Sequence, residues 1–247
     1  MGHARYNVFI DWIDLMLCSL QRDDESYLEV VDKYDNDLPE GERPIDLYSQ
    51  AFGHLQEGMS ETDADLLGVI YEELGMDSDH FGQYFTPHNI CDMKAEMVIT
   101  ADKDLDREKP YTVADPACGS GRLLVYAAKK IPSDVEAVFY GQDKDSTCAK
   151  MTALNLCFFN MTGYAVHGDS LKMEKHRVWQ TQGTALGGEI RELEEDEFPE
   201  IDYEAVQEEV ESQAEEIDNE FEEVSDHDVD LVEISETEGA TLADFDD

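Results

Sequence analysis

The residues most capable of chemistry in this sequence follow three short segments rich in β-branched and aromatic residues. The first segment is followed by Asp115-Pro116-Ala117-Cys118-Gly119-Ser120-Gly121, whose glycines would let backbone N–H groups approach a ligand. The second is followed by Gly141-Gln142-Asp143, and an acid at that place accepts both hydrogen bonds of a ribose diol. The third is followed by Gly168-Asp169-Ser170, where a carboxylate would accept a hydrogen bond from an adenine amino group.

Alternating strands and helices would bring these three motifs to one edge of a sheet. After Lys109 the pattern predicts, in turn, strand, helix, strand, helix and strand over residues 111–114, 121–130, 135–140, 147–160 and 164–166. This order is typical of an α/β fold with a parallel, doubly wound sheet, in which ligands bind beyond the carboxyl ends of the strands. One glycine turn or one acid is a weak signal, but three motifs at one edge predict a nucleoside-type cofactor.

Residues 1–80 are predicted to form a helical region that precedes an α/β core over residues 81–188. One apolar stripe has the three- and four-residue spacing of a helix, and its members are Phe9, Trp12, Ile13, Met16 and Leu20. A second helix is indicated by the capping-box pattern Thr62-Asp63-Ala64-Asp65 ahead of Leu66, with Gly75 as its end. A plain helical packing layer explains both patterns.

The charge of the chain is strongly and unevenly negative. The 247 residues carry 60 Asp and Glu against 17 Lys and Arg, a net charge of −43. Residues 189–247 hold 27 of these acids and one basic residue, so this tail is predicted to be disordered. The spread of acid over the rest of the chain favours a protein adapted to high salt over one that mimics or avoids polyanions. DNA binding would then require a local basic groove or a partner subunit.

Several other classes of protein are disfavoured by the sequence. The five cysteines form no C-x-x-C pair and the seven histidines do not cluster with them, which argues against a zinc site or a disulfide framework. No apolar run approaches the roughly 20 residues of a membrane span. The expectation is therefore a cytoplasmic protein without a metal or a membrane partner.

Four quoted segments carry a family resemblance. In chain order they read "DLLGVIYEELGMDSDHFGQYFTPHNI", "DPACGSGRLL", "FYGQDKDSTCAKMTALNL" and "HGDSL". They resemble the adenine-N6 DNA methyltransferases, in particular the modification subunit of type I restriction systems and its phage and plasmid relatives. The resemblance implies a Rossmann-like core, here a partial one, that binds S-adenosylmethionine. It also implies the residues that hold this cofactor, which are Phe85, Thr86 and Pro87 beside the methionine end, Asp115, Ala117, Gly119 and Gly121 at its amino and carboxylate groups, Asp143 at the ribose and Asp169 at the adenine.

The catalytic motif of that family is absent from the sequence. The resemblance implies Asp or Asn, then Pro-Pro, then Tyr or Phe, at the end of a fourth strand, which would orient and stack a flipped adenine. None of the seven prolines is adjacent to another, so the catalytic residues stay unassigned. Residues 177–181 form either a short fourth strand, with Trp179 as a stacking residue and Gln180 or Gln182 as acceptors, or an irregular segment in which Trp179 covers the sheet. The family's fourth strand lies beside the first, so the strand ending at Ala114 is predicted to be an open edge unless the helical region, residues 177–186 or another chain covers it.

Three functions remain open at this point. The first is an S-adenosylmethionine-dependent adenine-N6 DNA methyltransferase, reduced in size, that acts with a partner subunit for target recognition and with a second methyltransferase chain. The second is a catalytically inactive relative that binds the cofactor and acts as a regulator or scaffold. The third is an acidic interaction protein that mimics DNA, although blocks of like charge usually form solvated tails.

Overall fold

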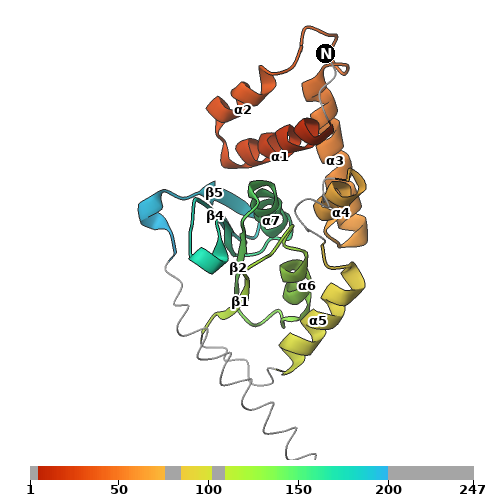
Figure 1. Cartoon of the computed structure of the whole chain (residues 1–247). Coiled ribbons are helices and arrows are strands. Elements are labelled where there is room, and N and C mark those ends of the chain that lie inside the picture. The colour runs from red at the N-terminus through yellow and green to blue at the C-terminus, as the bar shows by residue number, and fades with distance from the viewer. Residues whose placement is uncertain (1–4, 76–84, 102–108, 200–247) are drawn as a thin grey trace, which may run out of the picture. The chain divides into compact units, whose positions relative to one another are not determined.

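The computed structural model describes residues 5–75, 85–101 and 109–199. The N-terminal helices are α1 (Arg5–Gln21), α2 (Asp24–Val31), α3 (Pro44–Thr62) and α4 (Leu66–Glu73), followed by α5 (His88–Ala101). The sheet region contains β1 (Tyr111–Asp115), α6 (Arg122–Lys130), β2 (Ala137–Asp143), α7 (Ser146–Phe158) and β3 (Gly163–His167). It ends with the short 3-10 helix η1 (Ser170–Lys172), β4 (Arg177–Gln182), β5 (Glu189–Glu192) and the 3-10 helix η2 (Glu195–Glu197) (Figure 1).

The sheet is mixed and its five strands lie in sequence order, β1-β2-β3-β4-β5. β1, β2 and β3 are parallel, and the register pairs Asp115 with Gly141 and Asp143 with His167. β4 and β5 continue the sheet in antiparallel orientation beyond β3. The predicted α/β class and its strand–helix–strand–helix–strand order are confirmed. The carboxyl ends of β1, β2 and β3 lie at one edge, as parallel strands require.

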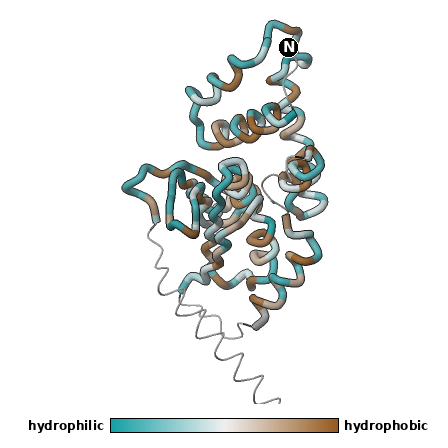
Figure 2. Tube along the Cα trace, viewed as in Figure 1, coloured by the Kyte–Doolittle hydropathy of each residue, from teal (hydrophilic) through white to brown (hydrophobic). Residues whose placement is uncertain are grey.

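Helices α6 and α7 pack on the same face of the sheet, together with three helices of the N-terminal region. Phe139 of β2, Ala165 of β3 and Trp179 of β4 share one buried cluster with apolar residues of α1, α3, α4, α6 and α7. Figure 2 shows hydrophobic segments along α1 and where helices and strands meet. Right-handed crossovers that step in one direction along a sheet place both helices on one face. The prediction of a doubly wound sheet is therefore wrong for the described residues, because no described strand lies on the outer side of β1.

The short fourth strand forms, but not at the place that the family order implies. β4 pairs with β3 through Val166 and Val178 and through Ala165 and Trp179. The side chain of Trp179 is fully buried in the main cluster. β1 consequently remains at the edge of the sheet within the described residues, and its residues Thr112 and Ala114 are exposed.

The N-terminal helical region agrees with the sequence in its apolar stripe and differs at one helix start. Phe9, Trp12, Ile13 and Met16 of α1 are buried as predicted. Thr62 is the last residue of α3, and the carboxylate of Asp65 caps α4 by accepting from the N–H of Gly68. The capping box predicted to start at Thr62 is therefore wrong, because Asp65, directly before α4, is the residue that caps this helix.

The described helices and strands of the predicted helical region and of the predicted α/β core lie in one compact unit. This unit holds the described residues up to Phe198, and it includes the N-terminal helices, β5 and η2. β5 lies inside the range assigned to the acidic tail, and it forms because Ile190 is buried opposite Thr181 of β4. The tail was predicted to be disordered, and its residues from 200 onward lie outside the described ranges. None of the described helices has the length and hydropathy needed to span a bilayer.

Candidate functional site

The turn after β1 is a tight loop that requires glycine at two positions. The backbone of Gly119 has φ +56° and that of Gly121 has φ +78°, both in the left-handed region that glycine adopts without strain. The carboxylate of Asp115 accepts from the N–H of Ala117 at 3.1 Å. The N–H of Cys118 donates to the carbonyl of Gln142 at 3.0 Å, which fastens the loop to the end of β2. Gly121 is the N-cap of α6, so the loop leads directly into a helix N-terminus.

The tips of β1 and β2 are joined through Asp143. One carboxylate oxygen of Asp143 accepts from the N–H of Gly119 at 2.9 Å, and the other accepts from the N–H of Asp145 at 2.8 Å. The side chain is largely buried, with the residue 9% exposed. Two of the predicted site residues, Gly119 and Asp143, are thus in direct contact.

The tip of β3 lies next to that of β2. The N–H of Gly168 donates to the carbonyl of Asp143 at 2.9 Å. Asp169 follows directly, and its carboxylate accepts from the N–H groups of Leu171 and Lys172 and forms an ion pair with the Lys172 ammonium at 3.1 Å. Asp169 therefore stands at the same edge as Asp143, while its carboxylate caps its own 3-10 turn.

Residues 85–87 lie alongside the glycine loop. The ring of Phe85 stacks on Tyr71 with a centroid separation of 5.4 Å. A Cβ atom added to Gly119 would lie 2.8 Å from the Phe85 ring, so only glycine lets this ring lie so close to the loop. The carbonyl of Thr86 accepts from Arg122 at 3.1 Å, and Pro87 directly precedes α5.

The three carboxylates at this edge have different electrostatic environments. Burial raises the pKa of Asp143, against hydrogen bonds from Asp145 and Gly119 that lower it. Burial also raises the pKa of Asp115, which lies near the charge of Asp143. The hydrogen bond from Lys172 lowers the pKa of Asp169. A cationic or hydroxyl-bearing ligand would stabilise the ionised forms of the buried Asp143 and the half-buried Asp115.

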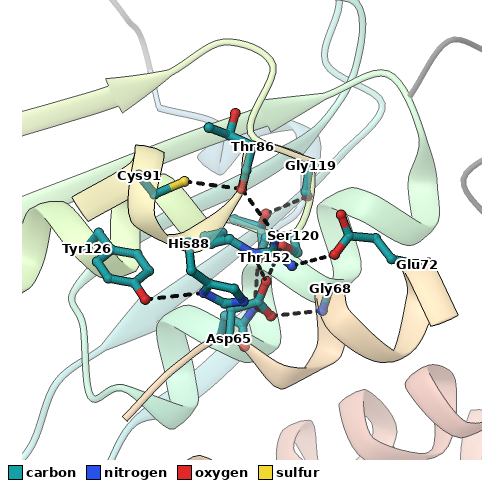
Figure 3. A network of polar contacts seen from close by, with 12 residues as sticks. Asp65, Gly68, Glu72, Thr86, His88, Cys91, Gly119, Ser120, Tyr126 and Thr152 are labelled. Atoms are coloured by element: carbon teal, nitrogen blue, oxygen red, sulfur yellow. Dashed lines mark hydrogen bonds and ion pairs between the residues drawn. The ribbon is translucent and has the colours of Figure 1, made fainter. Parts of the chain in front are cut away.

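Two further residues hold the loop and were missed from the sequence. The hydroxyl of Thr152 donates to the carbonyl of Gly119 at 2.9 Å (Figure 3). The amide of Asn155 donates to the carbonyl of Ser120 at 2.7 Å. With the Gly119 carbonyl directed at α7, the planar trans peptide directs the N–H of Ser120 away from that helix. Thr152 and Asn155 are one turn apart in an otherwise apolar stretch of α7, and this pair of buried polar residues was the available signal.

The buried Trp179 and the five buried cysteines supply no catalytic group at this edge. Trp179 is fully buried on the helix side of the sheet, so it cannot stack on a flipped base. Each alternative for this segment is therefore right in part, since the short strand forms but Trp179 covers the sheet. The five cysteines are buried and free, and burial raises the pKa values of Cys118 and Cys148, which makes these thiols poor nucleophiles. In the described ranges, no three His, Cys, Asp or Glu side chains are grouped as a metal ion would require.

Comparison with known proteins gives a consistent family signal. The family model described as N-6 DNA Methylase matches residues 62–186. The MjaVII methylase subunit of a type I restriction enzyme from Methanocaldococcus jannaschii is 31% identical over 130 residues, which are 49% of this chain and 21% of the relative. The MjaVIII methylase subunit from the same organism is 27% identical over 135 residues, 53% of this chain and 20% of the relative.

A type II methyltransferase extends the comparison beyond type I enzymes. M.MamI from Microbacterium ammoniaphilum is 29% identical over 137 residues, 49% of this chain and 38% of the relative. The chain thus spans about a fifth of the type I relatives and less than two fifths of the type II relative. No solved structure matches the chain.

Proposed function

Since this chain belongs to the N-6 DNA methylase family, we propose that it is the cofactor-binding part of an adenine-N6 DNA methyltransferase similar to type I modification subunits. S-adenosylmethionine is the cofactor that this membership implies. The observation that carries the proposal is the contact between the strand tips, in which Asp143 accepts from the N–H of Gly119 and its carbonyl accepts from Gly168.

The chain offers fitting groups for each part of the cofactor. We assign Asp115, Ala117, Gly119 and Gly121 to the amino and carboxylate groups, because the half-buried Asp115 carboxylate and a helix N-terminus lie together there. Residues 85–87 would border the same end.

For the nucleoside end, we assign Asp143 to the ribose hydroxyls and Asp169 to the adenine amino group. The raised pKa of Asp143, caused by burial, supports this assignment, since a buried carboxylate gains from hydroxyl donors. Bound there, the cofactor supplies an electrophilic methyl carbon, and the chain's own residues hold it and exclude water from it.

The groups that orient the target adenine would come from a segment beside β1. The N–H of Tyr111 points to β2, so the alternation of a parallel ladder directs the backbone groups of Thr112 and Ala114 to the outer edge. Within the described ranges no strand pairs with that edge. We propose that a strand of a second methyltransferase chain, with the acceptor and aromatic residues missing here, pairs with β1.

DNA contacts would likewise depend on a partner. A net charge of −43 repels the phosphate backbone, so the positive surface needed for DNA binding would be supplied by a recognition subunit. Molar salt would weaken this repulsion by shortening the Debye length to about 3 Å.

A binding and a transfer measurement test the proposal together. Isothermal titration of the full chain with S-adenosylmethionine, in salt at which the chain is folded, should show binding that Asp169→Ala weakens. The complex purified from its native cells through a tag on the full chain should transfer labelled methyl groups to the N6 atom of adenine in duplex DNA. Leu186→Ser, at a fully exposed position between β4 and β5, is the control that should change neither result.

A catalytically inactive relative is the second candidate, and the sequence gives a specific reason to retain it. No Pro-Pro pair exists in the chain, and the buried Trp179 cannot replace the missing aromatic residue. Tight cofactor binding without methyl transfer by the native complex would favour a regulator or scaffold. Failure of the folded chain to bind the cofactor would contradict both candidates and leave an acidic interaction protein.

A further inference from the structure

A fully buried carboxylate, Asp65, lies behind the glycine loop and is saturated with donors. One of its oxygens accepts from the N–H of Gly68 and from the Asn155 amide, both at 2.9 Å. The other accepts from the Ser120 hydroxyl at 2.5 Å (Figure 3). The same oxygen accepts from the Arg122 Nε at 3.1 Å. Asp65 thus connects the start of α4 to the β1–α6 loop and to α7.

Arg122 extends this network to the residues that border the loop. Its side chain is 4% exposed and donates to Asp65, to the Glu72 carboxylate at 2.9 Å and to the Thr86 carbonyl at 3.1 Å. Its guanidinium also lies 5.6 Å from the centre of the Phe85 ring. Burial by itself lowers the pKa of Arg122, but the two carboxylates outweigh burial and the net shift is upward. Arg122 is therefore a permanent cation joining α4, residues 85–86 and α6.

The glycine loop is consequently held from two sides. Asp65 holds the Ser120 side chain, while Asn155 holds both Asp65 and the Ser120 carbonyl. Thr152 holds the neighbouring carbonyl of Gly119. Apart from the Gly68–Asp65 cap within α4, these bonds join segments distant in sequence, so none of them is a local turn contact.

Folding alone does not explain such a network. Burying the Asp65 carboxylate and the Arg122 guanidinium carries a desolvation penalty that apolar residues of similar volume would avoid. Networks of this kind fix one geometry, and the geometry fixed here is that of the loop and of the Phe85–Thr86 segment beside it. These are the two segments that the proposed function assigns to the amino-acid end of the cofactor.

We propose that Asp65 and Arg122 are positioning residues that preorganise the glycine loop for the methionine end of S-adenosylmethionine. This inference rests on the proposed function and deepens its cofactor site. The proposal places neither side chain in contact with the cofactor. Each acts through Ser120 or Thr86.

Two ligands that share the methylthioadenosine portion, but of which only one has the amino-acid group and the sulfonium charge, separate positioning from simple stability. Isothermal titration would compare S-adenosylmethionine with 5′-methylthioadenosine, which lacks the aminocarboxypropyl group. Asp65→Asn should weaken binding of S-adenosylmethionine by about tenfold or more, as expected for lost bonds to a charged group, and change binding of 5′-methylthioadenosine by less than about twofold. All titrations would be run well below the melting temperature of each variant.

Two further variants keep the test decisive. Glu72→Gln alters a partly exposed partner of Arg122, so it can be tested even if Asp65→Asn fails to fold. It should weaken binding of S-adenosylmethionine by less than Asp65→Asn does, and again with little change in binding of 5′-methylthioadenosine. Asp14→Asn is the matched control, because Asp14 forms a partly buried ion pair with Lys150 of α7 at 2.5 Å but contacts no part of the loop. It should leave the ratio of the two affinities unchanged.

The possible outcomes distinguish the two proposals. If the wild-type chain binds both ligands and Asp65→Asn and Glu72→Gln weaken both equally or neither, the positioning role is overturned and the proposed function stands. If the folded wild-type chain binds neither ligand, the proposed function fails and this inference fails with it. Selective loss of S-adenosylmethionine affinity supports the positioning role.

Discussion

The loops after β1 and after β3 end at the same edge of the sheet but are held in different ways. The β1 loop is buried at Gly119 and Ser120 and is bonded to α4, α7 and β2. The β3 loop is capped by its own Asp169, and its apolar side chains are open, with Leu171 96% and Met173 65% exposed. One half of the candidate site is rigid, whereas the other half is held chiefly by local contacts.

This difference indicates which loop is ordered before the cofactor binds and which can adjust to it. Distant, buried hydrogen bonds fix the β1 loop before any ligand arrives, so binding at that end would cost little ordering entropy. Local caps and exposed side chains leave the β3 loop free to adjust. We therefore expect the amino-acid end of the cofactor to meet a preformed surface and the adenine end to meet one that closes on it.

Gly119→Ala should have the largest effect, because the β1 loop cannot move to accept a side chain. A φ of +56° and a Cβ 2.8 Å from the Phe85 ring combine backbone strain with overpacking. We expect a loss of about 2–4 kcal/mol in the free energy of unfolding, measured by urea denaturation. Gly75→Ala is the control, since Gly75 has φ +65° with open space around it and should lose only about 1–2 kcal/mol. If both variants lose the same free energy of unfolding, the β1 loop must shift to make room for the Cβ atom added at position 119, which would contradict the prediction.

Gly68→Ala should have the next largest effect, through the network behind the β1 loop. A Cβ at this position would lie 2.6 Å from the Ser120 hydroxyl and 2.8 Å from Arg122. Although alanine favours helices, we expect a loss of about 1–3 kcal/mol by overpacking. Gly53→Ala, in α3 with nothing nearby, should instead gain about 0.5–1 kcal/mol. An increase in the free energy of unfolding on Gly68→Ala would show that the side chains around Asp65 and Arg122 are loosely packed.

Lowering the pH should weaken cofactor binding through Asp115 and Asp143 before it protonates Asp169. The pKa values of Asp115 and Asp143 are raised above 3.8 by burial, and that of Asp169 is lowered by Lys172. Raised values in the folded state mean that Asp115 and Asp143 favour folding in acid and lose that contribution as the pH rises. If their ionised forms bind the cofactor, its affinity should fall as the pH is lowered from neutrality toward the raised pKa values of Asp115 and Asp143, while Asp169, whose pKa is lowered, stays ionised. Titration calorimetry showing constant affinity over this range would contradict their role.

Leu171→Ser should have the smallest effect on stability. The side chain is 96% exposed, so the free energy of unfolding should change by no more than about 0.5 kcal/mol. A loss above about 1 kcal/mol in thermal or urea unfolding would mean that the β3 loop depends on apolar packing. The contrast between the two loops would then disappear.

The sequence predicted the parts of this molecule that depend on local pattern. The strands at 111–115 and 163–167 and the helix at 146–158 follow from hydrophobic period and turn residues, and the parallel order of β1 to β3 follows from their alternation with helices. The position of β4 beside β3 could not be predicted from the local sequence pattern, because the pairing of these two strands depends on how Trp179 packs into the core between the sheet and the helices.

The candidate site was predictable only in part for the same reason. Gly119 and Asp143 stand in recognisable turns, and the structure joins them by a hydrogen bond. The roles of Asp65 and Asn155 depend on contacts 55 and 35 residues away from Ser120, which no local pattern encodes. An acid before a helix predicts a cap, and only the fold shows that this cap also holds the loop.

Amide hydrogen exchange of the full chain with and without S-adenosylmethionine tests most directly whether the three strand tips form one cofactor site. We predict slower exchange in peptides covering residues 115–122, 141–145 and 167–172, with the larger change in the last of these because the β3 loop is held mainly by local contacts. Binding that leaves all three segments unchanged, or protects only residues elsewhere in the chain, would contradict the shared site.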